Sequence, residues 1–186
     1  DIVKLFVYLR LKGVIVKGDK EFPFLLNLSM QHSEVDKLVE KGLLELGFED
    51  TYLIEARIKS NKVEIFLDSD EGVNFLKCQK LSRWLEAIFD EKKTFGENYV
   101  LEVSSAGVGS PLRFLRQYPK NIGRIIDIKY RDGKNVRGLL KEVNNNLILV
   151  EYETKVKEGK KNKKVIVTEE IKFEDIIESK IKISFN

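Results

Sequence analysis

Hydrophobic and polar residues follow helical and strand periods in turn over the first part of the chain. Apolar positions recur at helical spacing over residues 33–47, where a serine precedes the run and a glycine ends it. Residues 52–67 alternate between apolar and polar around a Ser-Asn turn, as in a β-hairpin. A second helical pattern follows the candidate N-cap Asn74, and residues 99–103 form a third alternating run. We therefore predict an α+β domain over residues 31–118, with two helices covering one face of a three-stranded sheet.

The pattern changes after residue 119 to short alternating runs that are separated by close-set turns, with little helical periodicity. An Asp-Gly pair at residues 132–133 is typical of a tight turn between two strands. The predicted strands cover residues 125–130, 136–143, 147–152, 165–167, 171–173 and 181–185. This arrangement predicts that residues 119–186 form an all-β small barrel of the SH3 or Sm type.

Residues 1–30 fit neither pattern. The run over residues 2–11 is apolar but contains a lysine and an arginine, so it is too short and too charged to span a membrane. It also lacks the basic start and small-residue cleavage site of a secretory signal. Because Met30 is the only methionine and the globular pattern begins three residues later, we expect residues 1–30 to be a leader outside the native domain. A strand pair that turns near residues 12–13 is the alternative.

Charge is distributed unevenly, although the formal net charge is only +3. Residues 119–186 hold 16 Lys and Arg against 11 Asp and Glu, a net of +5, which leaves 17 against 19, a net of −2, for the rest of the chain. A basic C-terminal part joined to a slightly acidic N-terminal part fits binding to RNA or ribonucleoprotein. An ordinary solvated surface explains the same imbalance.

Residue types that catalysis or metal binding needs are scarce. The single histidine, His32, lies in or beside the leader, so no base is expected near the serine pair at residues 104–105 and a nucleophilic triad is not predicted. The glycines that follow lack the spacing of a phosphate-binding loop. One cysteine, Cys78, cannot form an intrachain disulfide or, with one histidine, a structural zinc site. Acidic residues near Asp68 lack the spacing of a calcium loop. We predict no enzymatic activity, no metal and no cofactor.

One continuous motif, residues 99–113, is more informative than any single residue. It reads Tyr-Val-Leu-Glu-Val-Ser-Ser-Ala-Gly-Val-Gly-Ser-Pro-Leu-Arg. It resembles the signature of the ribosome maturation factor RimP family, which runs roughly Tyr-x-Leu-Glu-Val-Ser-Ser-Pro-Gly-Leu-Asp-Arg-Pro-Leu-Lys. Other pieces recur in family order at residues 121–124, 132–134, 138–140, 173–177 and 183–185. The resemblance covers about residues 33–186.

This resemblance implies a cytoplasmic, non-enzymatic factor that binds the immature small (30S) ribosomal subunit and assists its late assembly. The partners that it implies are 16S rRNA and small-subunit protein twelve, which the family engages through its barrel. We expect a monomer with no membrane association. Two alternatives remain: a single-strand RNA-binding regulator built on an Sm-like barrel, which should form rings, and an SH3-like protein-interaction adaptor, which should bind a peptide with little salt dependence.

The motif ends in a loop whose candidate functional residues are Ser104, Ser105, Gly107 and Pro111. The serines can hydrogen-bond to nearby backbone amides and the glycine can adopt a positive φ, so the loop could present amides to phosphate. A structural joint between two domains is the alternative. Ala106 stands where the family has proline, and Gly109-Ser110 replaces Asp-Arg, which predicts a looser turn.

Two basic clusters are candidate contacts with rRNA or the ribosome. A lysine-rich stretch, expected to be a mobile hairpin tip or loop, contains Lys155, Lys157, Lys160, Lys161, Lys163 and Lys164. A second cluster near the predicted domain joint contains Arg113, Arg116, Lys120 and Arg124. Such residues can bind phosphates and release counterions. A solubilising loop and a solvent-facing helix are the respective alternatives.

Overall fold

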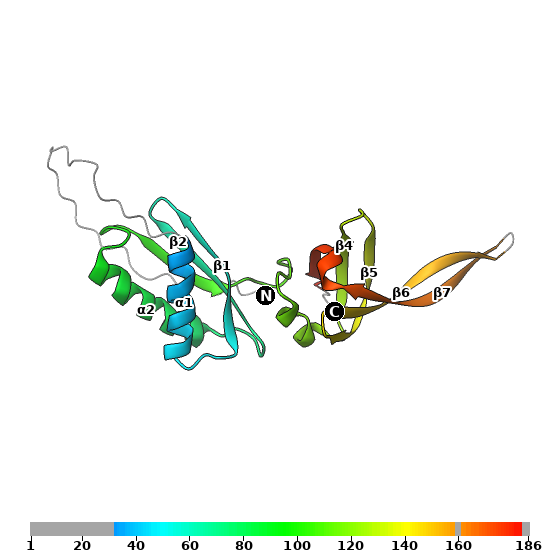
Figure 1. The fold of residues 1–186 in the computed structure, drawn as a ribbon, viewed down its shortest axis with the longest axis horizontal. Coiled ribbons are helices and arrows are strands. Elements are labelled where there is room, and N and C mark those ends of the chain that lie inside the picture. Colours follow the sequence, from blue (N-terminus) through cyan, green and yellow to red (C-terminus); the bar gives the residue numbers. More distant parts are fainter. Residues whose placement is uncertain (1–31, 159–160, 184–186) are drawn as a thin grey trace. The chain divides into compact units, whose positions relative to one another are not determined.

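The computed structural model describes residues 32–158 and 161–183, and it contains two compact units, the first ending at Ala106 and the second beginning at Gly107. The predicted leader, residues 1–30, lies outside the described residues. The prediction of a helix and a three-stranded sheet followed by a separate all-β part is confirmed (Figure 1).

The first unit is built from two helices and three strands. In chain order these are α1 (His32–Glu45), β1 (Thr51–Lys59), β2 (Lys62–Ser69), α2 (Phe75–Lys92) and β3 (Val100–Ser105). The sheet has the order β1-β2-β3, with β1 antiparallel to β2 and β3 parallel to β2. Because a parallel pair needs a crossover connection, α2 serves as the link from β2 to β3. The carboxyl ends of β2 and β3 therefore lie at the same edge of the sheet.

Both helices share one hydrophobic core with the inward-facing positions of the sheet. Its buried members include Val35, Val39 and Leu43 of α1, Leu81, Leu85 and Phe89 of α2, and Val63, Ile65, Leu67, Leu101 and Val103 of the strands. The α2 helix begins where expected, because the side chain of Asn74 accepts a hydrogen bond from the backbone N–H of Lys77 at 2.9 Å. The two helices approach closely at Gly42, where an added Cβ would lie 2.7 Å from the ring of Trp84.

The second unit contains five antiparallel strands and three short 3₁₀ turns. In chain order these are η1 (Leu115–Gln117), η2 (Pro119–Asn121), β4 (Ile125–Tyr130), β5 (Asn135–Asn144), β6 (Leu147–Glu158), β7 (Lys161–Lys172), η3 (Phe173–Asp175) and β8 (Ile176–Ile181). The sheet order is β7-β6-β5-β4-β8. Ile126, Ile128, Leu140, Ile148, Val150 and Ile171 form the centre of its core.

Three strands of the second unit, β6, β7 and β8, differ from the prediction. The lysine-rich stretch, expected to be a mobile hairpin tip or loop, lies mostly in the two strands of a hairpin, because β6 and β7 pair without interruption from Leu147↔Lys172 to Glu158↔Lys161. The last strand is Ile176–Ile181, whereas residues 181–185 were predicted. The strand was missed because Ser179 is polar and interrupts the alternation of apolar and polar residues, although its side chain is buried.

The division between the units falls after Ala106, although the sequence pattern places it near residue 118. The backbone N–H of Leu112 donates to the carbonyl of Ser179 at 2.9 Å. Tyr118 is fully buried, its hydroxyl lies 2.6 Å from the hydroxyl of Ser179, and its ring meets that of Phe173 edge-on at 5.8 Å. These contacts join the segment 107–118 to β8 and its neighbours, so this segment belongs with the second unit.

Candidate nucleic-acid interface

The distal halves of β6 and β7 form a two-stranded ribbon that leaves the core of the second unit (Figure 1). Ile148 and Val150 near the start of β6 are fully buried. Farther along, Val156 is 49% exposed and Ile166 is 74% exposed. We call residues 153–158 and 161–166 the lysine ribbon. An isolated two-stranded hairpin is marginally stable in water, and the lysine ribbon continues from strands of the five-stranded sheet.

Four lysines of the ribbon have described side chains. Lys155, Lys157, Lys163 and Lys164 are all exposed. The ammonium of Lys164 lies 2.6 Å from the carboxylate of Glu153. Of the other two predicted contact residues, Lys160 lies outside the described residues, and only the backbone of Lys161 is described. The register therefore brings these four described lysines together on one projecting element.

The second basic cluster is held by short 3₁₀ turns instead of a helix. Arg113, Arg116, Lys120 and Arg124 are exposed around two buried polar residues, Gln117 and Asn121. The side-chain carbonyl of Gln117 accepts from the backbone N–H of Arg113 at 2.7 Å, and the side-chain amide of Asn121 donates to the backbone carbonyl of Gln117 at 2.7 Å. Arg124 in turn donates to the Asn121 side chain at 2.9 Å. This frame gathers the four basic residues on the surface of the second unit.

The motif loop lies where the two units join. Ser104 and Ser105 end β3, and the N–H of Ala106 still pairs with the carbonyl of Leu67 at 3.0 Å. Gly107 then adopts a φ of 82°, as predicted for this position, and Gly109 a φ of 92°. Pro111 is exposed. Since the loop begins at the division between units, the geometry agrees with a structural joint. Phosphate binding by its amides stays a prediction.

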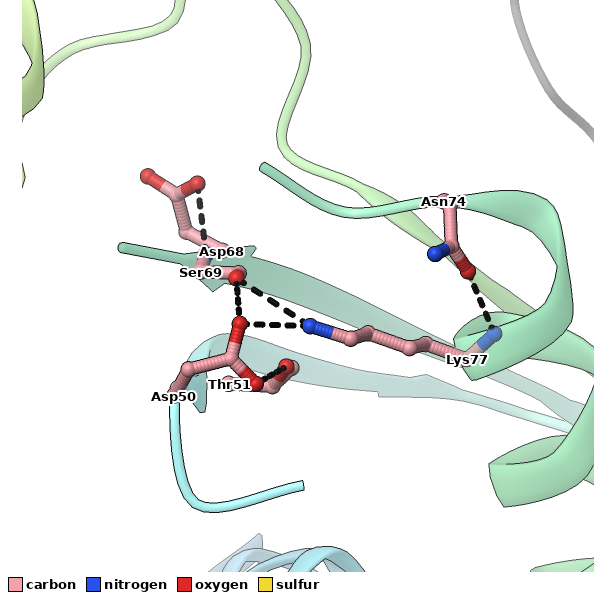
Figure 2. A network of polar contacts seen from close by, with 6 residues as sticks. All are labelled: Asp50, Thr51, Asp68, Ser69, Asn74 and Lys77. Atoms are coloured by element: carbon pink, nitrogen blue, oxygen red, sulfur yellow. Dashed lines mark hydrogen bonds and ion pairs between the residues drawn. The ribbon is translucent and has the colours of Figure 1, made fainter. Parts of the chain in front are cut away.

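A polar cluster at the carboxyl end of β2 was not predicted from the sequence (Figure 2). One carboxylate oxygen of Asp50 accepts hydrogen bonds from the fully buried Ser69 hydroxyl and from the Lys77 ammonium, the latter at 2.5 Å. The Thr51 hydroxyl donates to the other carboxylate oxygen at 3.2 Å. The hydrogen bonds from Lys77 and Ser69 lower the pKa of Asp50 to about 2. The cluster links β1, β2 and α2, and its lysine is engaged by a carboxylate instead of being available as a base.

The depressed pKa of Asp50 predicts that the first unit loses stability in acid. A carboxyl whose pKa falls from 3.8 to about 2 on folding stabilises the fold above pH 4, and this contribution is lost as the pH drops toward 2. Asp50→Asn should flatten the pH dependence in this window, whereas Glu91→Gln, an exposed site on α2, should not. Denaturant unfolding followed by the fluorescence of Trp84, the only tryptophan, measures this unit. An unchanged acid loss in Asp50→Asn would assign the effect to other carboxylates.

The described residues contain no group of three or more His, Cys, Asp or Glu side chains that could hold a metal ion. Cys78 is buried, and burial raises the pKa of its thiol to about 11, which keeps it protonated and unreactive. Neither helix of the described chain combines the length and apolar character that crossing a membrane requires.

Comparison with known proteins identifies the family. The profile of the RimP N-terminal domain matches residues 38–109. The ribosome maturation factor RimP of Flavobacterium psychrophilum is 37% identical over 155 residues, which cover 82% of this chain and 97% of that protein. This chain belongs to the RimP family. The RimP of Christiangramia forsetii is also 37% identical, over 159 residues that cover 84% of this chain and all of that protein. That of Cytophaga hutchinsonii is 31% identical over 152 residues, which cover 78% of this chain and 87% of that protein.

The family match and the structure agree on where the N-terminal part of a RimP chain ends. The match to the N-terminal domain stops at residue 109, inside the motif loop and close to the division after Ala106. The two proteins that are 37% identical to this chain match it over nearly their whole length, so the likeness extends beyond the N-terminal unit.

A second polar cluster of this RimP-family chain lies where the lysine ribbon meets the rest of the sheet, and it was also not predicted from the sequence. The carboxylate of Glu169 accepts from the hydroxyls of Tyr152 at 2.6 Å and Tyr130 at 3.2 Å, and from Lys134 at 2.7 Å. Burial alone would raise the pKa of Glu169, but the hydrogen bonds from Lys134 and the tyrosines outweigh it and hold the pKa below its usual value. These residues lie on different strands and turns, so no local pattern marks them.

Proposed function

We propose that this chain is a ribosome maturation factor that binds the immature small ribosomal subunit and assists its late assembly. The observation that carries the proposal is the match to proteins of that name over nearly their whole length. The exposed basic residues of the second unit support it, because a ribosomal partner presents a dense array of phosphates. The factor acts in the cytoplasm as a monomer and without enzymatic activity.

The proposed architecture is that of the family: two helices on the sheet of the first unit, and an SH3- or Sm-like barrel in the second. In this proposal the barrel contacts small-subunit protein twelve, while the basic residues contact 16S rRNA. Gly138 supports a closely packed barrel, because β6 passes so near that an added Cβ would lie 2.5 Å from the Glu151 carbonyl oxygen. The basic cluster around Gln117 and the lysine ribbon supply the phosphate contacts.

Sedimentation tests the proposal directly. The chain should co-sediment with small subunits purified from assembly-defective cells, and should do so more strongly than with small subunits taken from mature ribosomes. Equal binding to both, or binding to neither, would contradict a role in maturation.

The lysine ribbon should contribute a salt-dependent part of this affinity. We expect the variant Lys155→Ala/Lys157→Ala/Lys163→Ala/Lys164→Ala to keep its fold, because all four side chains are exposed. Removing one lysine–phosphate interaction should lower the slope of log affinity against log salt by about 0.7 to 0.9, so the four changes together should lower it by at most about 2.8 to 3.6. Binding to immature small subunits at several salt concentrations measures the slope.

A charge-matched control separates phosphate binding by the ribbon from a change in net charge. Lys37, Lys41, Lys59 and Lys92 are four exposed lysines of the first unit, and their replacement with alanine removes the same charge. This control should leave the slope close to that of the unmodified chain. Parallel slopes for the ribbon variant and the unmodified chain would instead make the ribbon a solubilising element.

A further inference from the structure

The strand register divides the lysines of the ribbon between two faces. In an antiparallel pair, residues directly opposite each other lie on the same face, and successive residues along a strand alternate. Lys155 lies opposite Lys164, and Lys157 lies opposite Asn162. These three lysines therefore share one face. Lys163 lies opposite Val156, on the other face.

The other face is a continuation of the core side of the sheet. Ile148 and Val150 are fully buried, and Val156 follows them at even spacing along β6. Thr154 and its cross-strand partner Val165 occupy the neighbouring positions of this face. Among the side chains that the structure describes in the lysine ribbon, Lys163 is the single cation of this face, whereas the first face carries its cations as a group.

The basic face holds more positive charge than its own carboxylate balances. Lys155 and Lys164 are direct cross-strand neighbours, an arrangement of like charges that destabilises a ribbon by itself. Glu153 offsets only Lys164, at 2.6 Å. Among the residues that the structure describes, neither Lys155 nor Lys157 forms an ion pair. A phosphate on this face would remove the repulsion, which a neutral partner would not do.

We infer that the ribbon binds RNA through one face, with successive phosphates of a single strand running along Lys157, Lys155 and Lys164. This inference rests on the proposed function and specifies how the ribbon contacts its partner. Residues i and i+2 of one strand, such as Lys155 and Lys157, are about 6.6 to 6.8 Å apart, and paired strands are about 4.7 to 4.9 Å apart. The first distance is comparable to the separation of neighbouring phosphates in a nucleic-acid strand, so the two lysines of β6 can each meet one phosphate.

Glu153 has a defined role in this arrangement. Its carboxylate lies on the basic face, because its cross-strand partner Ile166 is two residues beyond Lys164. It therefore competes with phosphate for Lys164 and repels the RNA strand. Removing its charge should release Lys164 for a phosphate contact, so Glu153→Gln should bind more tightly than the unmodified chain.

Single-charge variants test the inference, each of them a change at an exposed site. Lys155→Ala and Lys157→Ala should each lower the salt slope by about 0.7 to 0.9. Lys163→Ala, which removes the same charge from the same ribbon, should leave the slope nearly unchanged. Glu153→Gln should raise it by up to the same amount, about 0.7 to 0.9. The measurement is binding of the full chain to immature small subunits and, in parallel, to deproteinised small-subunit rRNA.

Three outcomes would overturn the inference. An effect of Lys163→Ala equal to that of Lys157→Ala would show that charge alone matters and not the face. Effects that appear with intact subunits but not with bare rRNA would mean that the face contacts an acidic protein surface. Unchanged binding by every variant would show that the lysine ribbon does not contact RNA. Failure of the proposed function looks different. The unmodified chain would then bind bare rRNA but not immature subunits, and the variants would still show the expected face preference with bare rRNA.

Discussion

Tyr118→Ala is expected to destabilise the second unit by about 3 to 5 kcal/mol, the usual cost of removing a large aromatic side chain from a core. Tyr118 is fully buried, and its ring packs edge-on against Phe173. Its hydroxyl is the hydrogen-bond partner of the buried Ser179, so truncation leaves that serine without this partner as well. A destabilisation of this size is a large fraction of the free energy of unfolding of a small domain.

The same variant tests where the chain divides. If residues 107–118 belong with the second unit, Tyr118→Ala should leave unfolding of the first unit, followed by Trp84 fluorescence, unchanged. Amide hydrogen exchange in β4, β5 and β8 should become much faster. Phe114→Ala, in the same segment but at a site that is 44% exposed, is the control and should cost far less. If the Trp84 transition reported a destabilisation as large as the one measured by hydrogen exchange, Tyr118 would contribute to the stability of both units, and the division after Ala106 would be contradicted.

Gly138→Ala is expected to cost about 1 to 3 kcal/mol, through overpacking instead of a cavity. An added Cβ would lie 2.5 Å from the Glu151 carbonyl oxygen and 2.6 Å from a methyl of Val150. Both neighbours belong to β6, and one of them is backbone, so relief requires β5 and β6 to move apart. That movement would weaken the strand pairing from which the lysine ribbon extends.

Hydrogen exchange of the β5 and β6 amides measures this effect. Asn135→Ala is the matched control, since Asn135 lies on β5 but is exposed. Gly138→Val should be worse than Gly138→Ala, because the larger side chain must occupy the same gap. A neutral Gly138→Ala would mean that β6 can shift at little cost, which would contradict the close packing of these two strands.

The family motif identifies the family of this protein, but the motif sequence does not say what its own residues do. Residues 99–113 carry the resemblance to RimP, and the comparison confirms the family. The same residues are compatible both with a phosphate-binding loop and with a structural joint. The position of the unit division at Ala106 favours the joint, and it depends on contacts that Leu112 and Tyr118 make with Ser179. No spacing within the motif predicts these contacts, because Ser179 lies far along the chain.

The sequence predicted the lysines of the candidate interface but not the faces on which they lie. The lysines of residues 155–164 are visible as a cluster in the sequence because they are close together along the chain. Which of them share a face depends on the pairing of β6 with β7, and a shift by one residue would exchange the faces. The clusters around Asp50 and Glu169 could not be found from the sequence, since each unites residues from three or more separate elements.

The kinds of elements, the helix start after Asn74, the family and the two basic clusters could all be predicted from the sequence alone. Periodicity and capping report on the exposure and hydrogen bonding of neighbouring residues, so local sequence contains that information. The three-dimensional structure was needed to find the parallel pairing of β3 with β2, the division after Ala106, the strands that contain the lysine segment and the faces of its side chains. These features depend on contacts between residues distant in the chain. Their free energies come from burial and pairing across strands, which no local pattern records.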